Sequence, residues 1–257
     1  MSLNENLSLG LPHTTRLRLE ELDVVFVDLD DTIVEYRTAC KKAFREVTKL
    51  LPELGNEDVE RLEIDYQLLR SENLPKLFYN VISPEEERKE RLDMVLRTRD
   101  IHLEDSLLEL MNKVFNDSFW KNRRASDGAV EFLEMCRVKS VPVAVITNGD
   151  REMQEKSLEV ARLKTLVESV ITPMRLEEMK PNSSLFERAL RVTASRKEHT
   201  VMIGDSWEYD VVGSLKAGIK PIWVNRSKLR TPPDSGVEWV TSLSDLTQNM
   251  KGGDKNV

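Results

Sequence analysis

The chain has 257 residues, of which 40% are hydrophobic and 32% charged, and its formal net charge is −7 at pH 7. This composition is typical of a soluble globular protein and excludes a largely disordered chain. A pI near 5.3 argues against a nucleic-acid partner. No stretch approaches the roughly 20 apolar residues that a membrane-spanning helix needs, and no apolar run of signal-peptide length opens the chain. We therefore expect a cytoplasmic protein with no membrane partner.

Short apolar runs rich in β-branched or aromatic residues predict buried strands, because they are too short for buried helices. Four runs are clear and two are weaker, near 169–171 and 237–240. The four clear runs are Val24–Val27, Val141–Ile146, Val201–Ile203 and Pro221–Val224.

Apolar stripes with helical spacing lie between the later strands, at 129–136, 185–190 and 211–215. Ser126 or Asp127 is expected to cap the first of these helices. Strands that alternate with helices in this way predict a parallel sheet covered on both faces. In such sheets the ligand site lies at the carboxyl ends of the strands.

The first strand is followed by about ninety residues without a strand pattern. Four amphipathic patterns fill this stretch, near 43–51, 59–69, 83–96 and 107–115. The third begins with a capping box at Ser83 and a proline at the first helical position, Pro84. These features predict a helical bundle inserted after the first strand.

The expected fold class is therefore α/β, with a Rossmann-like doubly wound parallel sheet core and an inserted α-helical bundle cap. We place the discontinuous core at 20–35 and 124–250 and the cap at 36–123. An N-terminal leader is expected over 1–19 and a disordered tail over 251–257. Cys40 and Cys136 lie in helical apolar patterns, which predicts buried free thiols.

Polar segments follow three of the predicted strands. The first is Asp28-Leu29-Asp30-Asp31-Thr32, in which Asp28 and Asp30 are two residues apart and can face one site. Close carboxylates repel, and a divalent metal would relieve that repulsion. Taken alone, this acidic cluster could equally be a solvated turn.

Three further segments complete the set. Thr147 and Asn148 precede a glycine after the next strand, a pattern that suits an oxyanion or a turn. Lys180 precedes a helix and could neutralise a phosphate, or simply be solvated. Asp205 and Asp210 follow a later strand, where they could hold a hard cation or cap a helix.

The order and spacing of these four segments resemble the motifs of the haloacid dehalogenase superfamily along nearly the whole chain. The matching motifs are Asp-x-Asp-x-Thr from Asp28, Thr147 in Ile-Thr-Asn-Gly, Lys180 in Met-Lys-Pro, and Gly-Asp-x-x-x-x-Asp from Gly204 to Asp210. A helical insertion after the first motif matches the subclass with a bundle-type cap.

The resemblance implies a phosphatase that forms an aspartyl-phosphate. It makes Asp28 the nucleophile and Asp30 the general acid and base. It implies that Mg²⁺ is the cofactor, held by Asp28, the Asp30 backbone carbonyl, Asp205 and waters, with Asp210 as a further ligand or support. Thr147, Asn148 and Lys180 would then bind the phosphoryl oxygens.

Two alternatives are kept beside this one. Members of the superfamily that cleave carbon–halogen bonds lack the second aspartate of the first motif, so Asp30 favours a phosphate ester over a 2-haloacid. A phospho-accepting receiver domain places similar groups on a doubly wound sheet, but it lacks the helical insertion. Asp31 stands where the superfamily commonly has glycine, and we expect it to be structural or outward-facing.

The expected partner is a small-molecule phosphate ester, and the chain is expected to be a monomer or homodimer. The Gly-Asp-Ser form of the fourth motif resembles the branch that includes pyrimidine 5′-nucleotidases, acylneuraminate-9-phosphatases and sugar- or triose-phosphate phosphatases. No cap motif names the substrate. The basic stretch 121–124 could meet an anionic substrate or form a solvated linker.

Overall fold

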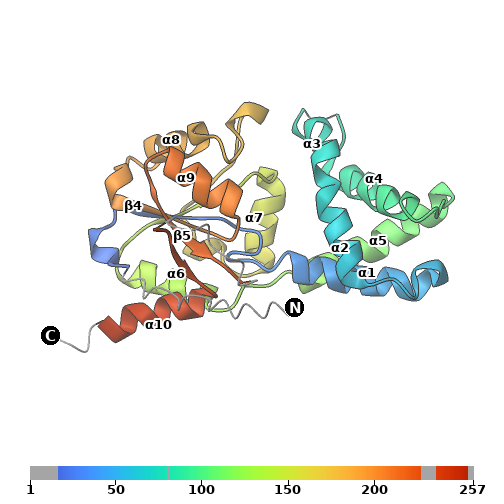
Figure 1. Ribbon diagram of the computed structural model, residues 1–257, viewed down its shortest axis with the longest axis horizontal. Helices are drawn as coiled ribbons and strands as arrows, with labels where there is room; N and C mark the ends of the chain where they lie inside the picture. Colours follow the sequence, from blue (N-terminus) through green and yellow to red (C-terminus); the bar gives the residue numbers. More distant parts are fainter. Residues whose placement is uncertain (1–16, 80, 227–235, 254–257) are drawn as a thin grey trace, which may run out of the picture.

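The computed structural model describes residues 17–79, 81–226 and 236–253. Two bodies are visible in Figure 1, a sheet covered by helices α6 to α10 and a separate bundle of helices α1 to α5. The two are joined by chain segments that lie beside the ends of the sheet strands. This arrangement agrees with a core and an inserted cap.

The sheet consists of six parallel strands in the order β3-β2-β1-β4-β5-β6. Strand β1 is central, and its Val27 is in register with Val145 of β2 and Ile203 of β4. Because all strands run in one direction, their carboxyl ends share one edge, and the predicted α/β fold class is confirmed. The strands are β1 (Val24–Val27), β2 (Val143–Ile146), β3 (Ser169–Ile171), β4 (Thr200–Gly204), β5 (Lys220–Val224) and β6 (Glu238–Val240).

Both faces of the sheet are covered, because successive residues of a strand point to opposite sides. Val25 and Val27 of β1 pack in one cluster with α6 (Ala129–Val138), α7 (Arg151–Val160) and α10 (Leu243–Gly253). Val24 and Phe26 pack in another cluster with α8 (Ser183–Val192). Helix α9 (Gly213–Lys216) lies beside α8 on that same side (Figure 1).

Two local expectations were wrong. Helix α6 begins at Ala129 and its N-cap residue is Gly128, whose φ of 74° is left-handed, so neither Ser126 nor Asp127 caps it. The apolar stripe predicted near 211–215 is not buried along its whole length, because Leu215 is half exposed although Val211 is buried. Residues Trp207–Val212 form a π-helix, and its wider turn shifts the apolar face away from the α-helical spacing.

Described residues near both ends of the chain are part of the folded core body. Leu17 and Leu19, within the predicted leader, are buried in the core. Helix α10 runs to Gly253, so residues 251–253 of the predicted tail are helical. Leu243 and Leu246 anchor that helix in the core. Residues 1–16 and 254–257 lie outside the described residues.

Among its described residues the cap contains five α-helices, where the sequence predicted four patterns. The unpredicted one is α3, which has a proline inside and few apolar residues, so its helical spacing is weak. The capping box is confirmed, because Ser83 accepts a hydrogen bond from Glu86 N and Glu86 accepts one from Ser83 N. The helices are α1 (Arg37–Leu50), α2 (Val59–Leu68), α3 (Arg70–Phe78), α4 (Pro84–Arg97) and α5 (Asp105–Asn122).

The cap has a hydrophobic core of its own, formed by residues between 36 and 120. At its centre Phe44, Tyr66 and Phe115 pack edge-on or tilted, with ring centroids 5.0–5.5 Å apart. Two adjacent linkers join the cap to the sheet, since Glu35 N donates to Arg124 O at 2.9 Å. The boundaries at 35/36 and 123/124 stay predictions, and this linker pair runs through them.

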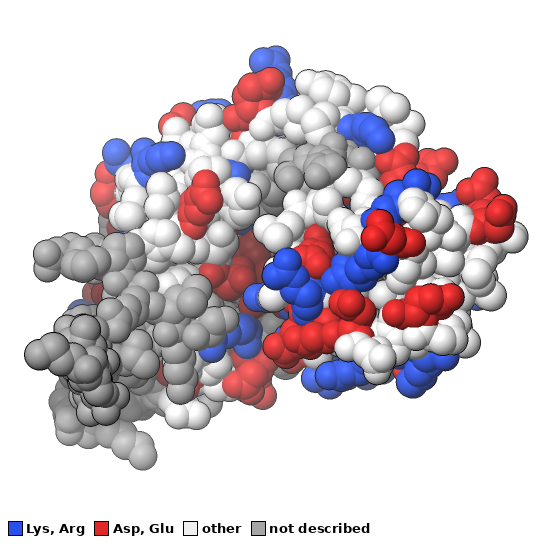
Figure 2. All heavy atoms as spheres, turned by 45° about the vertical axis from the view of Figure 1, so that its right-hand side comes forward, with Lys and Arg blue, Asp and Glu red and all other residues white. Residues whose placement is uncertain are grey.

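Two expectations about the composition also have structural outcomes. Cys40 and Cys136 are buried free thiols, as predicted. Within the described part of the chain, no helix is both long and apolar enough to cross a bilayer. On the face shown in Figure 2, acidic and basic side chains of the described residues are intermixed rather than gathered by sign.

Candidate active site

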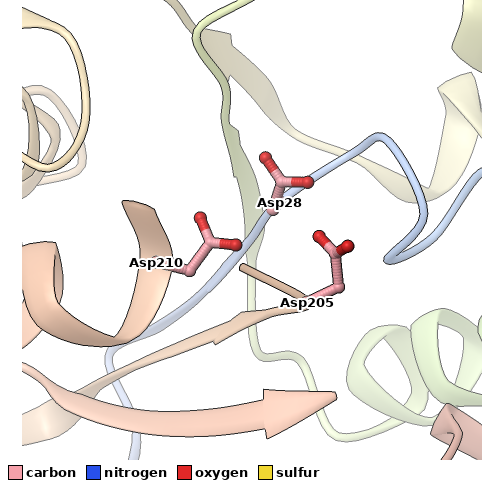
Figure 3. A group of neighbouring side chains, drawn as sticks. All are labelled: Asp28, Asp205 and Asp210. Carbon is pink, nitrogen blue, oxygen red and sulfur yellow. The ribbon is translucent and has the colours of Figure 1, made fainter. Parts of the chain in front are cut away.

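Three carboxylates converge at the carboxyl edge of the sheet (Figure 3). Asp28 directly follows β1, Asp205 directly follows β4, and Asp210 lies in the π-helix Trp207–Val212. One oxygen from each lies within 4.8 Å of the others. Asp28 and Asp210 are buried and Asp205 is partly buried. Asp28 thus forms one acidic cluster with two aspartates that lie 177 and 182 positions later in the sequence, because parallel strands end side by side.

Lys180 bridges two of these carboxylates from within the protein. Its Nζ donates to Asp28 Oδ1 at 2.6 Å, to Asp210 Oδ1 at 2.7 Å and to the Ile146 carbonyl at 2.8 Å. Burial alone would lower the pKa of Lys180, but Asp210 and Asp28 raise it above its usual range. The lysine is therefore held as a buried cation with all three of its protons engaged.

Three carboxylates against one ammonium leave the cluster with excess negative charge. Burial raises the pKa of Asp28 to about 7, and the neighbouring Asp210 adds to that rise while Lys180 opposes it. Burial, followed by repulsion from Asp28 and Asp210, raises the pKa of Asp205 well above its usual range. A divalent cation would satisfy these oxygens, and oxygen-only donor sets suit magnesium.

The spacing of the fourth motif has a steric reason. A Cβ on Gly204 would lie 2.3 Å from Cγ of Asp210, so the carboxylate rests directly against the glycine. Asp210 Oδ2 also accepts a hydrogen bond from Ser206 N at 3.0 Å. Gly204 therefore lets the π-helix bring Asp210 against the end of β4, where Lys180 reaches it.

Thr147 and Asn148 follow β2, beside the acidic cluster. Thr147 is buried, and its Oγ1 accepts a hydrogen bond from Gly149 N at 3.1 Å. The Asn148 side chain donates to Lys180 O at 2.9 Å and accepts from Lys180 N at 2.8 Å. Asn148 therefore fixes the backbone of the lysine, a contact that the sequence did not indicate.

Asp30 faces a different group from the other three aspartates. Arg123 Nη2 donates to Asp30 Oδ1 at 2.6 Å, and Gln154 Nε2 lies 3.5 Å from Asp30 Oδ2. Arg123 is itself held by Ser157 Oγ at 2.9 Å and by the Glu35 carbonyl at 3.2 Å. The Asp30 carboxylate is thus oriented by the second linker and by helix α7.

Sequence reasoning left the basic stretch 121–124 open and did not place Arg123 in the site. Arg123 is only 3% exposed, and its guanidinium lies 5.3 Å from the ring centroids of both Tyr36 and Phe119. The available signal was its position four residues after the buried Phe119, directly after the end of α5. Its neighbour Arg124 is exposed and pairs with Glu35, as expected of a linker. Gln154 gave no signal in the sequence.

Asp31 has the structural role that was expected. Its φ of 61° is left-handed, which explains why glycine suits this position in related motifs. Its Oδ1 accepts hydrogen bonds from the backbone N–H groups of Tyr36 and Arg37 at 2.9 Å, at the start of α1. Burial raises the pKa of Asp31 to about 6, although these two bonds oppose the rise.

The structure therefore brings four of the seven predicted residues around one point, Asp28, Lys180, Asp205 and Asp210. Asn148 is bonded to the backbone of Lys180, Thr147 follows β2 at the same edge of the sheet, and Asp30 is bonded to Arg123. Their chemical roles stay predictions.

Comparison with known proteins places the chain among characterised enzymes. It is 26% identical over 253 residues to human N-acylneuraminate-9-phosphatase, covering 90% of this chain and 96% of that protein. It is 25% identical over 232 residues to a glyceraldehyde 3-phosphate phosphatase from Methanothermobacter thermautotrophicus, covering 88% and 97%.

The fold is shared more widely than the sequence. The solved structure of L-2-haloacid dehalogenase from Xanthobacter autotrophicus matches with a TM-score of 0.66, covering 90% of this chain and 99% of that one, at 15% identity. At that identity the likeness concerns the fold alone. The profile of the haloacid dehalogenase-like hydrolases matches residues 24–224, which include every site residue named above. The chain belongs to the haloacid dehalogenase-like hydrolase family.

Proposed function

We propose that this enzyme is a magnesium-dependent phosphatase that transfers the phosphoryl group of a small metabolite ester to Asp28. The observation that carries the proposal is the meeting of Asp28, Asp205 and Asp210 around Lys180 at one edge of the sheet. Family membership and relatives named as phosphatases support hydrolysis of phosphate esters.

The proposed magnesium ligands are the carboxylates of Asp28 and Asp205 and the backbone carbonyl of Asp30, completed by water. Both oxygens of Asp210 already accept hydrogen bonds, from Lys180 Nζ and Ser206 N. We therefore assign Asp210 a supporting position that orients the lysine. When bound, Mg²⁺ neutralises charge on the phosphoryl oxygens and on the carboxylates around it.

Two steps follow from these positions. One oxygen of Asp28 attacks phosphorus, the bond from phosphorus to the alcohol oxygen breaks, and Asp30 gives the leaving oxygen its proton. Asp30 then takes a proton from water, whose oxygen attacks the phosphoryl group on Asp28. Inorganic phosphate leaves and the Asp28 carboxylate is restored. Arg123 and Gln154 would hold Asp30 in place for both proton transfers.

Thr147, the Asn148 backbone N–H and Lys180 would bind the equatorial oxygens of the phosphoryl group. Lys180 Nζ already contacts the nucleophile at 2.6 Å, so it can follow the charge that develops beside Asp28. Donors fixed before the reaction stabilise such charge without reorganising, which is where most of the rate gain in phosphoryl transfer arises.

A small phosphorylated metabolite is the proposed substrate, and nucleoside monophosphates and sugar or triose phosphates are the classes to test first. The relatives named as phosphatases of N-acylneuraminate 9-phosphate and glyceraldehyde 3-phosphate support this range. A dehalogenase is the second candidate, since its fold is shared. The presence of Asp30, bonded to Arg123, favours the phosphatase. Only hydrolysis of a phosphate ester releases an alkoxide that needs a proton donor.

The first experiment measures hydrolysis of p-nitrophenyl phosphate by the purified chain. EDTA should abolish activity and added Mg²⁺ should restore it. Asp28→Asn should lose turnover while remaining folded, and Asp117→Asn, an exposed aspartate on cap helix α5, should behave as the wild type. Normal hydrolysis by Asp28→Asn, or full activity without metal, would refute the proposal.

The role of Asp30 is tested with leaving groups of different pKa. Asp30→Asn should lose most activity toward alkyl phosphates, whose alkoxides need a proton, and least toward p-nitrophenyl phosphate. Equal losses for both would contradict its proton-transfer role. Halide release from a 2-haloacid would instead support the dehalogenase, and a long-lived phosphoryl group on Asp28 would support a phospho-accepting module.

A further inference from the structure

A pocket between cap and core opens beside Asp30, on the side where the leaving group of a phosphate ester would lie. Its empty volume is about 510 Å³, including the part open to solvent. Three arginines of the cap line it, Arg70 from α3 and Arg88 and Arg91 from α4. Tyr36 and Trp120 add aromatic walls.

Buried polar atoms in this pocket lack partners among the described residues. Arg91 is 3% exposed and Glu87 is 4% exposed. Arg91 Nη2 donates to Glu87 Oε2 at 3.1 Å, but Arg91 Nε and Nη1 and Glu87 Oε1 have no hydrogen-bond partner in the described part. These atoms have almost no exposed surface, and the Arg91 guanidinium lies 3.8 Å from the ring centroid of Tyr66. The ion pair therefore forms part of the pocket wall, and the charge of Arg91 is held behind that wall.

The Arg88 side chain crosses the pocket and has contacts with both the cap and the core. Its Nε donates to Asn116 Oδ1 on α5 at 2.6 Å, and its Nη1 lies 3.5 Å from Met153 Sδ on α7 of the core. The guanidinium therefore spans from the cap to the core while its orientation is fixed by Asn116. A fixed guanidinium offers paired N–H donors, a geometry that matches carboxylate and phosphate oxygens.

The charge of the pocket favours an anion. On the cap side three arginines face one carboxylate, Glu87. Arg123 is already engaged by its bond to Asp30 at 2.6 Å. Asp150 on the core side accepts the backbone N–H of Met153 and so serves as the cap of α7. Net positive charge thus remains where the leaving group would lie.

We propose that this pocket binds a second anionic group, a carboxylate or a phosphate, carried by the alcohol part of the substrate. This inference rests on the proposed phosphatase function. Arg88 and Arg70 would bind the anion, and the buried charge of Arg91 behind the pocket wall would favour it electrostatically. The cap would select phosphorylated acids or bisphosphates over neutral sugar phosphates.

Matched substrate pairs test this selectivity in the presence of Mg²⁺. The carboxylate arm compares kcat/KM for 6-phosphogluconate with that for glucose 6-phosphate. The phosphate arm compares fructose 1,6-bisphosphate with fructose 6-phosphate. Hydrogen bonds between charged groups predict a preference of about tenfold to a hundredfold for the anionic member of at least one pair, and the preferred arm identifies the anion.

Variants then assign the preference to the pocket. Arg88→Met should lower the anionic-to-neutral ratio of kcat/KM by about tenfold or more, and Arg70→Met should lower it in the same direction. The matched control is Arg97→Met, on the same helix but exposed and paired with Asp93, which should keep the wild-type ratio. Circular dichroism confirms that each variant is folded.

The outcomes separate this inference from the function on which it rests. If p-nitrophenyl phosphate is hydrolysed with Mg²⁺ but neither pair favours the anion, the anion site is refuted and the phosphatase stands. An anionic preference that survives both Arg88→Met and Arg70→Met also refutes the site. If no ester is hydrolysed at all, the phosphatase proposal itself fails.

Discussion

Asp28→Asn should remove a pH-dependent loss of stability that we expect of the metal-free protein. Burial raises the pKa of Asp28 to about 7 from its ordinary 3.8, so the folded state holds a proton that the unfolded chain has already released. Stability therefore falls as the pH rises from about 4 through 7, because ionising this group is harder in the folded protein. Asparagine cannot ionise, so the variant should lack this part of the pH dependence.

The size of the effect follows from the same values. The two pKa values of Asp28, 3.8 when unfolded and about 7 when folded, limit the loss of unfolding free energy to roughly 4 kcal/mol. Each tenfold change in proton affinity contributes about 1.4 kcal/mol. Near pH 8 in EDTA the variant should thus be more stable than the wild type, although its asparagine keeps only part of the interaction of Asp28 with Lys180. Mg²⁺ at a hundredfold excess over its dissociation constant would stabilise the wild type by about 2.7 kcal/mol.

Urea unfolding in EDTA at several values between about pH 5 and pH 8 measures this prediction. The quantity compared is the free energy of unfolding of wild type minus that of Asp28→Asn, which cancels titrations common to both. Asp117→Asn, an exposed partner of Lys113, should follow the wild type. The reasoning is refuted if wild type and Asp28→Asn lose stability in parallel over this range.

Three further substitutions test the local structure. Gly128→Ala should destabilise the fold by roughly 2 kcal/mol or more in urea unfolding, since φ is 74° and the new Cβ would lie 2.1 Å from Ser244 N; an unchanged midpoint would contradict the close approach. Asp31→Ala should cost about 1–2 kcal/mol, because it removes two hydrogen bonds at the start of α1, whereas Asp31→Asn should retain most of that stability; equal losses would argue against capping. Arg123→Met should lower kcat for alkyl phosphates by about tenfold or more by releasing the Asp30 carboxylate, with the exposed neighbour Arg124→Met as control; equal effects of the two variants would show that the bond to Asp30 does not matter.

The sequence determined the elements of this protein that depend on local chemistry. The apolar run before Asp28 specifies a buried strand, and Ser83 with Glu86 specifies a helix start, because both signals are complete within a few residues. Motif spacing placed Asp28, Thr147, Lys180 and Asp205 at or near strand ends. A parallel sheet then requires strand ends to share an edge, so the site could be anticipated before any coordinates.

Only the tertiary structure decided which partners these residues have. The pairing of Arg123 with Asp30, 93 positions apart, depends on the two linkers lying side by side. The π-helix at Trp207–Val212 occurs where Asp210 contacts Gly204 and Lys180, and no local sequence pattern predicts it. The arginines of the cap pocket had the sequence pattern of ordinary surface charges on amphipathic helices. Burial and pairing are properties of the folded whole, since they depend on groups from distant parts of the chain that only folding brings together.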